Sequence, residues 1–82
     1  MVGFSLYRRY TVVIQGTSLS QINDFVNHAR ANMDLHGTTE SLSSENYFII
    51  SNLTKEQYEI LHYLFNRYPP EKKVGMILVG GE

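Results

Sequence analysis

Hydrophobic and polar side chains alternate in the first part of the chain. Between Tyr7 and Gln15, the side chains of Tyr10, Val12 and Ile14 fall on one side of an extended backbone and the residues between them on the other. A period of two, together with many β-branched and aromatic residues, is typical of a β-strand. We therefore predict a strand over Tyr7–Gln15 that ends at Gly16.

The apolar spacing changes after Gly16. Ser18 and Gln21 have the spacing of a capping box, in which each side chain bonds a backbone N–H of the first helical turn. A helix is predicted to follow and to end between Asn32 and Gly37, with an apolar stripe formed by Ile22, Phe25, Val26, Ala29 and Met33.

The strongest local signals lie between Tyr47 and Tyr68. Tyr47–Ile50 is a short apolar run of the kind found in strands covered on both faces, and Ser51-Asn52 ends it. Thr54 and Gln57 form a second capping box, and Pro69-Pro70 predicts that the helix stops near Arg67. The apolar stripe of this helix consists of Tyr58, Leu61, Leu64, Phe65 and Tyr68.

Two further segments complete the pattern. Val74–Val79 is a second apolar strand, and Gly37–Ser44 is polar and is predicted as an edge strand or an extended loop. Two strand–helix–strand halves in 82 residues indicate one α+β domain over residues 1–82. The expected fold is a ferredoxin-like βαββαβ sandwich: an antiparallel four-stranded sheet of order 4-1-3-2 with both helices on one face.

Composition narrows the classes of function. The hydrophobic fraction of 43% disfavours a disordered chain, and the absence of cysteine excludes a thiolate site. The net charge of −1 disfavours a protein that mainly neutralises phosphates. No apolar run has the length of a membrane span and no signal-peptide core is present, so we expect a cytoplasmic protein. Glu59 and His62 have a metal-ligand spacing, but only one such pair exists. We expect neither metal, cofactor nor enzymatic activity.

The sheet face without helices is the predicted binding surface. We expect Val12, Ile14, Phe48 and Ile50 to lie under the helices, so the residues between them in each strand should face outward. Ser51 and either Met76 or Ile77 are expected on the same outward face. The residues predicted to bind a partner are Tyr7, Arg9, Thr11, Val13, Tyr47 and Ile49. An exposed apolar patch usually meets a partner, and a homodimer needs only one such patch. The alternative is that these are strand-forming residues shaded by their neighbours.

One segment suggests a different ligand. Phe48-Ile49-Ile50-Ser51-Asn52-Leu53, followed by a helix, resembles the first strand and helix of the RNA-recognition motif. In that family an aromatic residue stacks on RNA from the open sheet face, whereas here Ile49 occupies the stacking position. The resemblance implies single-stranded RNA binding, in which bases are stacked and phosphates held by a set of aromatic and basic residues: Tyr7, Arg8, Arg9, Tyr47, Lys72 and Lys73.

The sequence therefore favours a non-enzymatic protein that docks on another protein. In size and composition it is similar in type to small phage-encoded regulators and inhibitors. RNA binding through the same face is the alternative, and the near-neutral charge is the main argument against it. Both the sheet face and an edge strand are open as the contact surface.

Overall fold

The computed structural model of the chain describes residues 9–81 and contains four strands and two helices in the predicted order. The elements are β1 (Tyr10–Gln15), α1 (Leu19–Asn32), β2 (Thr39–Ser44), β3 (Tyr47–Leu53), α2 (Lys55–Asn66), a short 3-10 helix η2 (Pro70–Lys72) and β4 (Gly75–Gly81). The predicted α+β, βαββαβ fold is confirmed.

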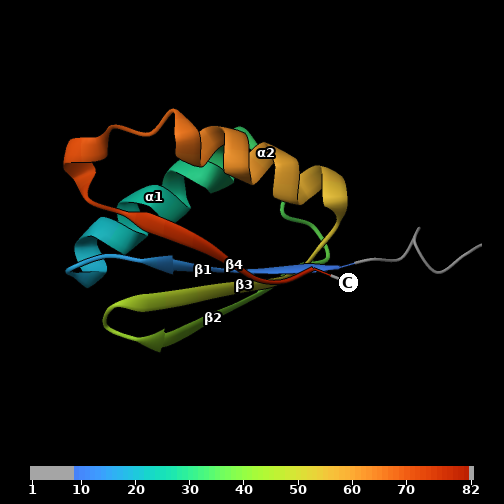
Figure 1. Cartoon of the computed structure of the whole chain (residues 1–82), viewed down its shortest axis with the longest axis horizontal. Coiled ribbons are helices and arrows are strands. Elements are labelled where there is room, and N and C mark those ends of the chain that lie inside the picture. Colours follow the sequence, from blue (N-terminus) through green and yellow to red (C-terminus); the bar gives the residue numbers. More distant parts are fainter. Residues whose placement is uncertain (1–8, 82) are drawn as a thin grey trace, which may run out of the picture.

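The strands form one antiparallel sheet of order β2-β3-β1-β4. β1 and β3 occupy the centre, as the 4-1-3-2 order predicts, and β2 and β4 are the two edges. The polar segment Gly37–Ser44 contains strand β2, all of whose side chains are exposed. Figure 1 shows α1 and α2 on the same side of the sheet, so they leave the other face uncovered.

The core lies between the sheet and the two helices. Alternate residues of the central strands point into it, and the predicted set of Val12, Ile14, Phe48 and Ile50 is confirmed as buried. α1 buries four side chains, whereas α2 fully buries only Leu61. Leu53 of β3 also belongs to the core. The four core residues of α1 are Ile22, Phe25, Val26 and Ala29.

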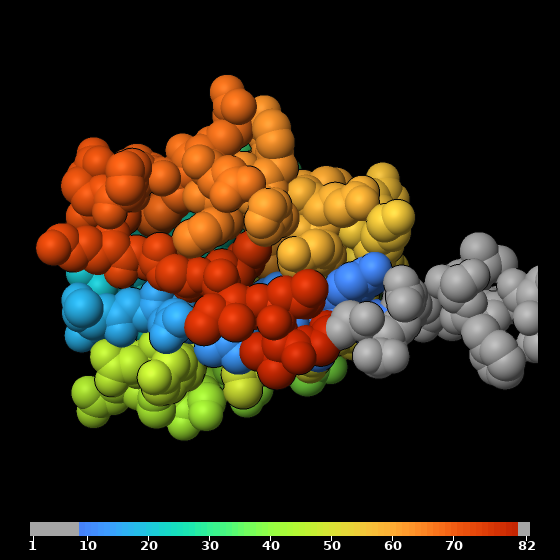
Figure 2. Space-filling model, in the orientation of Figure 1, coloured from blue at the N-terminus to red at the C-terminus, as the bar shows by residue number. Residues whose placement is uncertain are grey.

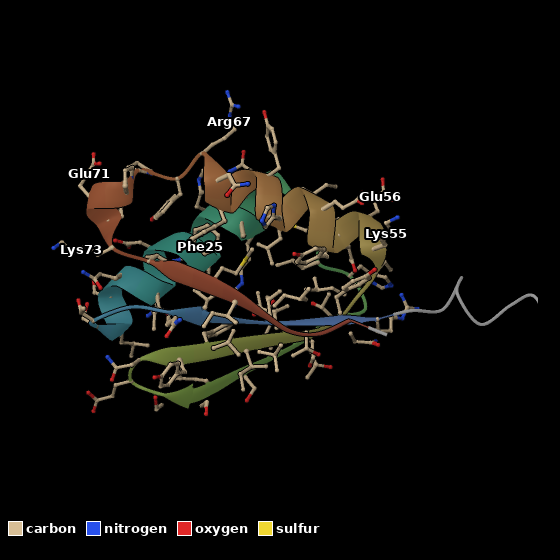
Figure 3. The ribbon with its side chains drawn as sticks, viewed as in Figure 1. Phe25, Lys55, Glu56, Arg67, Glu71 and Lys73 are labelled. Atoms are coloured by element: carbon tan, nitrogen blue, oxygen red, sulfur yellow. The ribbon has the colours of Figure 1, made fainter. Side chains whose placement is uncertain are left out.

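Aromatic side chains join the two helices to each other and α2 to the sheet. The ring of Phe25 on α1 meets the rings of Phe65 and Tyr68 edge to face, with centroids 5.9 and 4.9 Å away. Tyr58 of α2 stacks on Tyr10 of β1, with a centroid distance of 5.0 Å. Figure 3 shows Phe25 between the helices. These contacts fix α2 over the sheet although it buries little aliphatic area.

Of the two predicted capping boxes, the one at the start of α2 is complete and the one at the start of α1 is not. Thr54 forms the complete capping box: its hydroxyl accepts from Gln57 N at 3.0 Å, and Gln57 Oε1 accepts from Thr54 N at 2.9 Å. Ser18 caps α1 by accepting from Gln21 N, but Gln21 Oε1 accepts from N and Oγ1 of Thr17, one residue earlier than a capping box requires.

Two side-chain amides hold the loop between α1 and β2. Gln57 Nε2 donates to the carbonyl oxygens of Asp34 and His36, at 3.1 and 2.9 Å. Asn52 Nδ2 donates to Gly37 O at 2.9 Å. Asn52 has a φ of 63°, a left-handed conformation that asparagine tolerates better than most residues. The loop is therefore tied to both β3 and the start of α2.

Candidate functional site

The sheet face opposite the helices is formed by uncharged side chains and glycines. Its positions follow from the strand registers, because directly paired residues of antiparallel strands share a face. We define the open face as Thr11, Val13 and Gln15 of β1, Thr39, Ser41 and Ser44 of β2, Tyr47, Ile49 and Ser51 of β3, and Gly75, Ile77 and Gly80 of β4.

An apolar row crosses the middle of the open face. Val13 is paired with Ile49 on one side and with Ile77 on the other. Val13 and Ile49 are half-buried, so neighbouring side chains partly shade them, whereas Ile77 is 49% exposed. Hydroxyl-bearing and amide side chains lie on both sides of this row. The face is therefore flat and apolar at its centre, with polar groups around it.

Charged side chains are placed elsewhere in the described part of the chain. Glu40 of β2 is paired with Ile50, on the helix side of the sheet, and forms an ion pair with Arg30 of α1. Figure 3 shows Lys55 projecting from the start of α2 and Arg67 projecting from the chain just after the end of α2. The guanidinium of Arg67 lies over the Tyr63 ring, 5.0 Å from its centroid. None of these charges lies on the open face.

The residues predicted from sequence to bind a partner are partly brought together. Four of the six lie on the open face: Thr11, Val13, Tyr47 and Ile49. Arg9 directly precedes β1 and is exposed, and Tyr7 lies outside the described residues. The choice between Met76 and Ile77 is resolved by the register, because Met76 is paired with Ile14 and packs against the core.

Thr11 and Ser51 were predicted on this face, but the polar residues that β2 adds to it were not. Thr39 and Ser41 flank the apolar row because β2 is paired with β3 in a register that only the hairpin reveals. The one signal in the sequence is the period-two spacing of these hydroxyl residues in a segment with few other features.

β4 carries further exposed apolar side chains. Leu78 is paired with Val12, on the helix side of the sheet, and is still 46% exposed. Val79 lies at an irregularity in the β1–β4 register and is 62% exposed. Together with Ile77, these residues make the outer part of β4 apolar on both of its faces.

The histidines and the hollow beside α2 give weaker indications of a ligand site than the open face does. His62 is exposed, and its Nδ1 lies 3.3 Å from Nδ2 of Asn66 rather than beside Glu59. Within residues 9–81 no three His, Asp or Glu side chains gather as metal ligands. A shallow hollow of about 380 Å³ is lined by the loop before β2 and the start of α2, including Asp34, His36, Thr54, Glu56, Gln57 and Ile60.

The ionisation of one tyrosine is altered by its surroundings. Partial burial, and to a smaller extent the carboxylate of Asp24, raise the pKa of the Tyr68 hydroxyl above its ordinary value of 10.0. Tyr68 lies beside Phe25 on the helix side of the molecule. Its altered ionisation therefore belongs to the packing between helices and not to the open face.

No family model matches this chain, and no curated protein or solved structure shows significant similarity to it. In the described region, none of the helices combines the length and the apolar character needed to cross a membrane.

Proposed function

We propose that the protein is a non-catalytic binding module that docks on another protein through the open face and acts as a regulator or inhibitor of that partner. The observation that carries the proposal is the uncharged face with the apolar row Val13, Ile49 and Ile77 at its centre. Apolar side chains on a solvated sheet face are a common mark of a protein interface.

The chemistry of the face favours protein over single-stranded RNA as the ligand. RNA binding needs cationic groups for the phosphates and exposed rings on which bases stack. Tyr47 supplies one exposed ring, at 45%, but Phe48 points into the core and is 8% exposed. The described cations that adjoin the face in the chain are Arg9, two residues before Thr11, and Lys73, two residues before Gly75, and both lie at the ends of strands rather than on the face. A partner surface that is apolar at its centre and offers hydrogen bonds around it fits these groups better.

The experiment compares two variants carrying the same substitution at different places. Ile49→Glu puts a carboxylate in the middle of the apolar row. Ile60→Glu puts it on α2, where the wild-type side chain is 37% exposed. Each protein is immobilised, incubated with lysate of the native cell, and the retained proteins are quantified. We expect a specific protein that the wild type and Ile60→Glu retain and that Ile49→Glu loses at least about tenfold, because burying an unpaired charge costs more than 1.4 kcal/mol.

Circular dichroism of both variants establishes that each is folded. Equal retention by the two variants would exclude the open face as the docking surface. Salt-dependent retention on a mixture of RNAs, abolished in Ile49→Glu, would instead support the RNA alternative.

A further inference from the structure

The two edges of the sheet are unlike each other. β2 is polar, all its side chains are exposed, and Glu40 is held there by Arg30. Both edge strands have an irregularity in their register, between Leu42 and Ser44 in β2 and at Val79 in β4, so the difference between them is the charged residue, which opposes pairing with another chain. β4 has the sequence Gly-Met-Ile-Leu-Val-Gly-Gly, with no charged residue and no proline. Only β2 has the side chains that protect an edge.

β4 is incompletely covered on both faces. Ile77 points to the open face and Leu78 to the helix side, yet these side chains are 49% and 46% exposed. Figure 2 shows the red atoms of β4 at the surface of the molecule, in front of β1. A partner docked on the open face alone would cover Ile77 and leave Leu78 in water. A strand added beside β4 covers both.

We propose that β4 pairs antiparallel with β4 of a second copy, which joins the two sheets into one of eight strands. A two-fold axis perpendicular to the sheet passes between the two Ile77 residues, so that they lie opposite each other on the open face. Met76 then lies opposite Leu78 of the second copy on the helix side. All three contacts are apolar, and directly opposed apolar residues stabilise antiparallel strands.

A second copy fits this edge better than an unrelated strand because the edge matches itself. No like charges oppose each other along the pair, since β4 carries none.

Dimerisation through β4 would also enlarge the open face. The row Ile49, Val13 and Ile77 of one copy continues into Ile77, Val13 and Ile49 of the other, because both open faces lie on the same side of the joined sheet. The dimer does not require that this face binds a protein, so it can be tested separately from the proposed function.

The test uses two leucines in corresponding places. Leu78 of β4 and Leu42 of β2 are both on edge strands, both on the helix side, and 46% and 50% exposed. Sedimentation equilibrium of the full chain is measured from about 1 µM to about 1 mM, the range of weak protein association. We expect a concentration-dependent dimer for the wild type, a dissociation constant raised at least tenfold in Leu78→Lys, and an unchanged constant in Leu42→Lys.

Amide hydrogen exchange then locates the contact. Outward-pointing N–H groups of β4 are expected to exchange more slowly at concentrations where the dimer forms than where the chain is monomeric. The proposal is overturned by a monomer across the whole range, by equal weakening in the two leucine variants, or by a dimer whose β4 amides exchange as fast as those of the monomer. Ile49→Glu, which lies away from the edge, should keep the dimer, so loss of capture and loss of dimer are separable.

Discussion

The side chain of Gln57 bonds in two directions, which makes replacement of its amide by a carboxylate a sharp test of the structure. Its Oε1 accepts from Thr54 N in the capping box, while its Nε2 donates to Asp34 O and His36 O. Capping-box rules treat Glu and Gln at this position as equivalent, and the helix dipole favours an acidic residue in the first turn. Those rules alone predict that Gln57→Glu is neutral or stabilising.

The structure predicts the opposite. A carboxylate keeps the bond from Thr54 N but cannot donate to the two carbonyl oxygens. Each lost hydrogen bond costs about 0.5–1.5 kcal/mol, or about 1–3 kcal/mol for both. The dipole returns about 0.3–1 kcal/mol. We therefore expect Gln57→Glu to lower the free energy of unfolding by about 1–2 kcal/mol, which for a domain of this size lowers the melting temperature by roughly 5–15 °C.

Gln21 provides the matched control at the corresponding position of α1. Its Oε1 accepts two bonds from Thr17, whereas no hydrogen bond from its Nε2 is formed within residues 9–81. A carboxylate keeps both accepted bonds and strengthens them by its charge. Gln21→Glu should thus be neutral or stabilising by up to about 1 kcal/mol.

Urea unfolding followed by circular dichroism measures both variants at neutral pH. The expected result is a lower midpoint for Gln57→Glu and an equal or higher midpoint for Gln21→Glu, with unchanged denaturant dependence. If the two substitutions shift stability in the same direction, the bonds from Gln57 to the loop before β2 contribute nothing measurable and the reasoning is refuted.

Two further predictions concern the contact between the helices. Phe25→Ala should lower the free energy of unfolding by about 3–5 kcal/mol, because the ring is fully buried among aromatic partners, and Phe25→Leu should cost less; equal costs in urea unfolding would contradict this. Since burial and Asp24 raise the pKa of Tyr68, the unfolded chain releases this proton first, and stability should fall as pH rises above about 10. Tyr68→Phe should reduce that fall between about pH 9 and pH 11, and an identical pH profile would show that Tyr68 is not its source.

Local periodicity and capping chemistry predicted most of the fold. The alternation around Val12 and Ile14 identified the buried side of β1, and Pro69-Pro70 located the end of α2. These features depend on residues a few positions apart, whose relation is fixed by backbone geometry. The bonds from Gln57 to Asp34 and His36 join residues more than 20 positions apart, and only the packed structure brings them together.

The candidate site was predictable in position but not in character. The parity of β1 and β3 correctly placed Val13 and Ile49 on the face without helices. That this face carries no charge depends on the register of β2 and β4, which short polar or uniformly apolar strands do not specify. The exposure of Leu78 depends on how far α2 extends over the edge of the sheet, and no local pattern reports that distance.

The unequal burial of the two helices determines how the molecule comes apart. α1 is anchored by four fully buried side chains and α2 by Leu61, supported by partly covered rings such as that of Tyr58. We therefore expect separation of α2 alone to require less free energy than global unfolding and to precede the loss of α1. Such a partly opened state would uncover Tyr10 of β1, on which Tyr58 stacks, and we expect proteolysis and aggregation to begin from it.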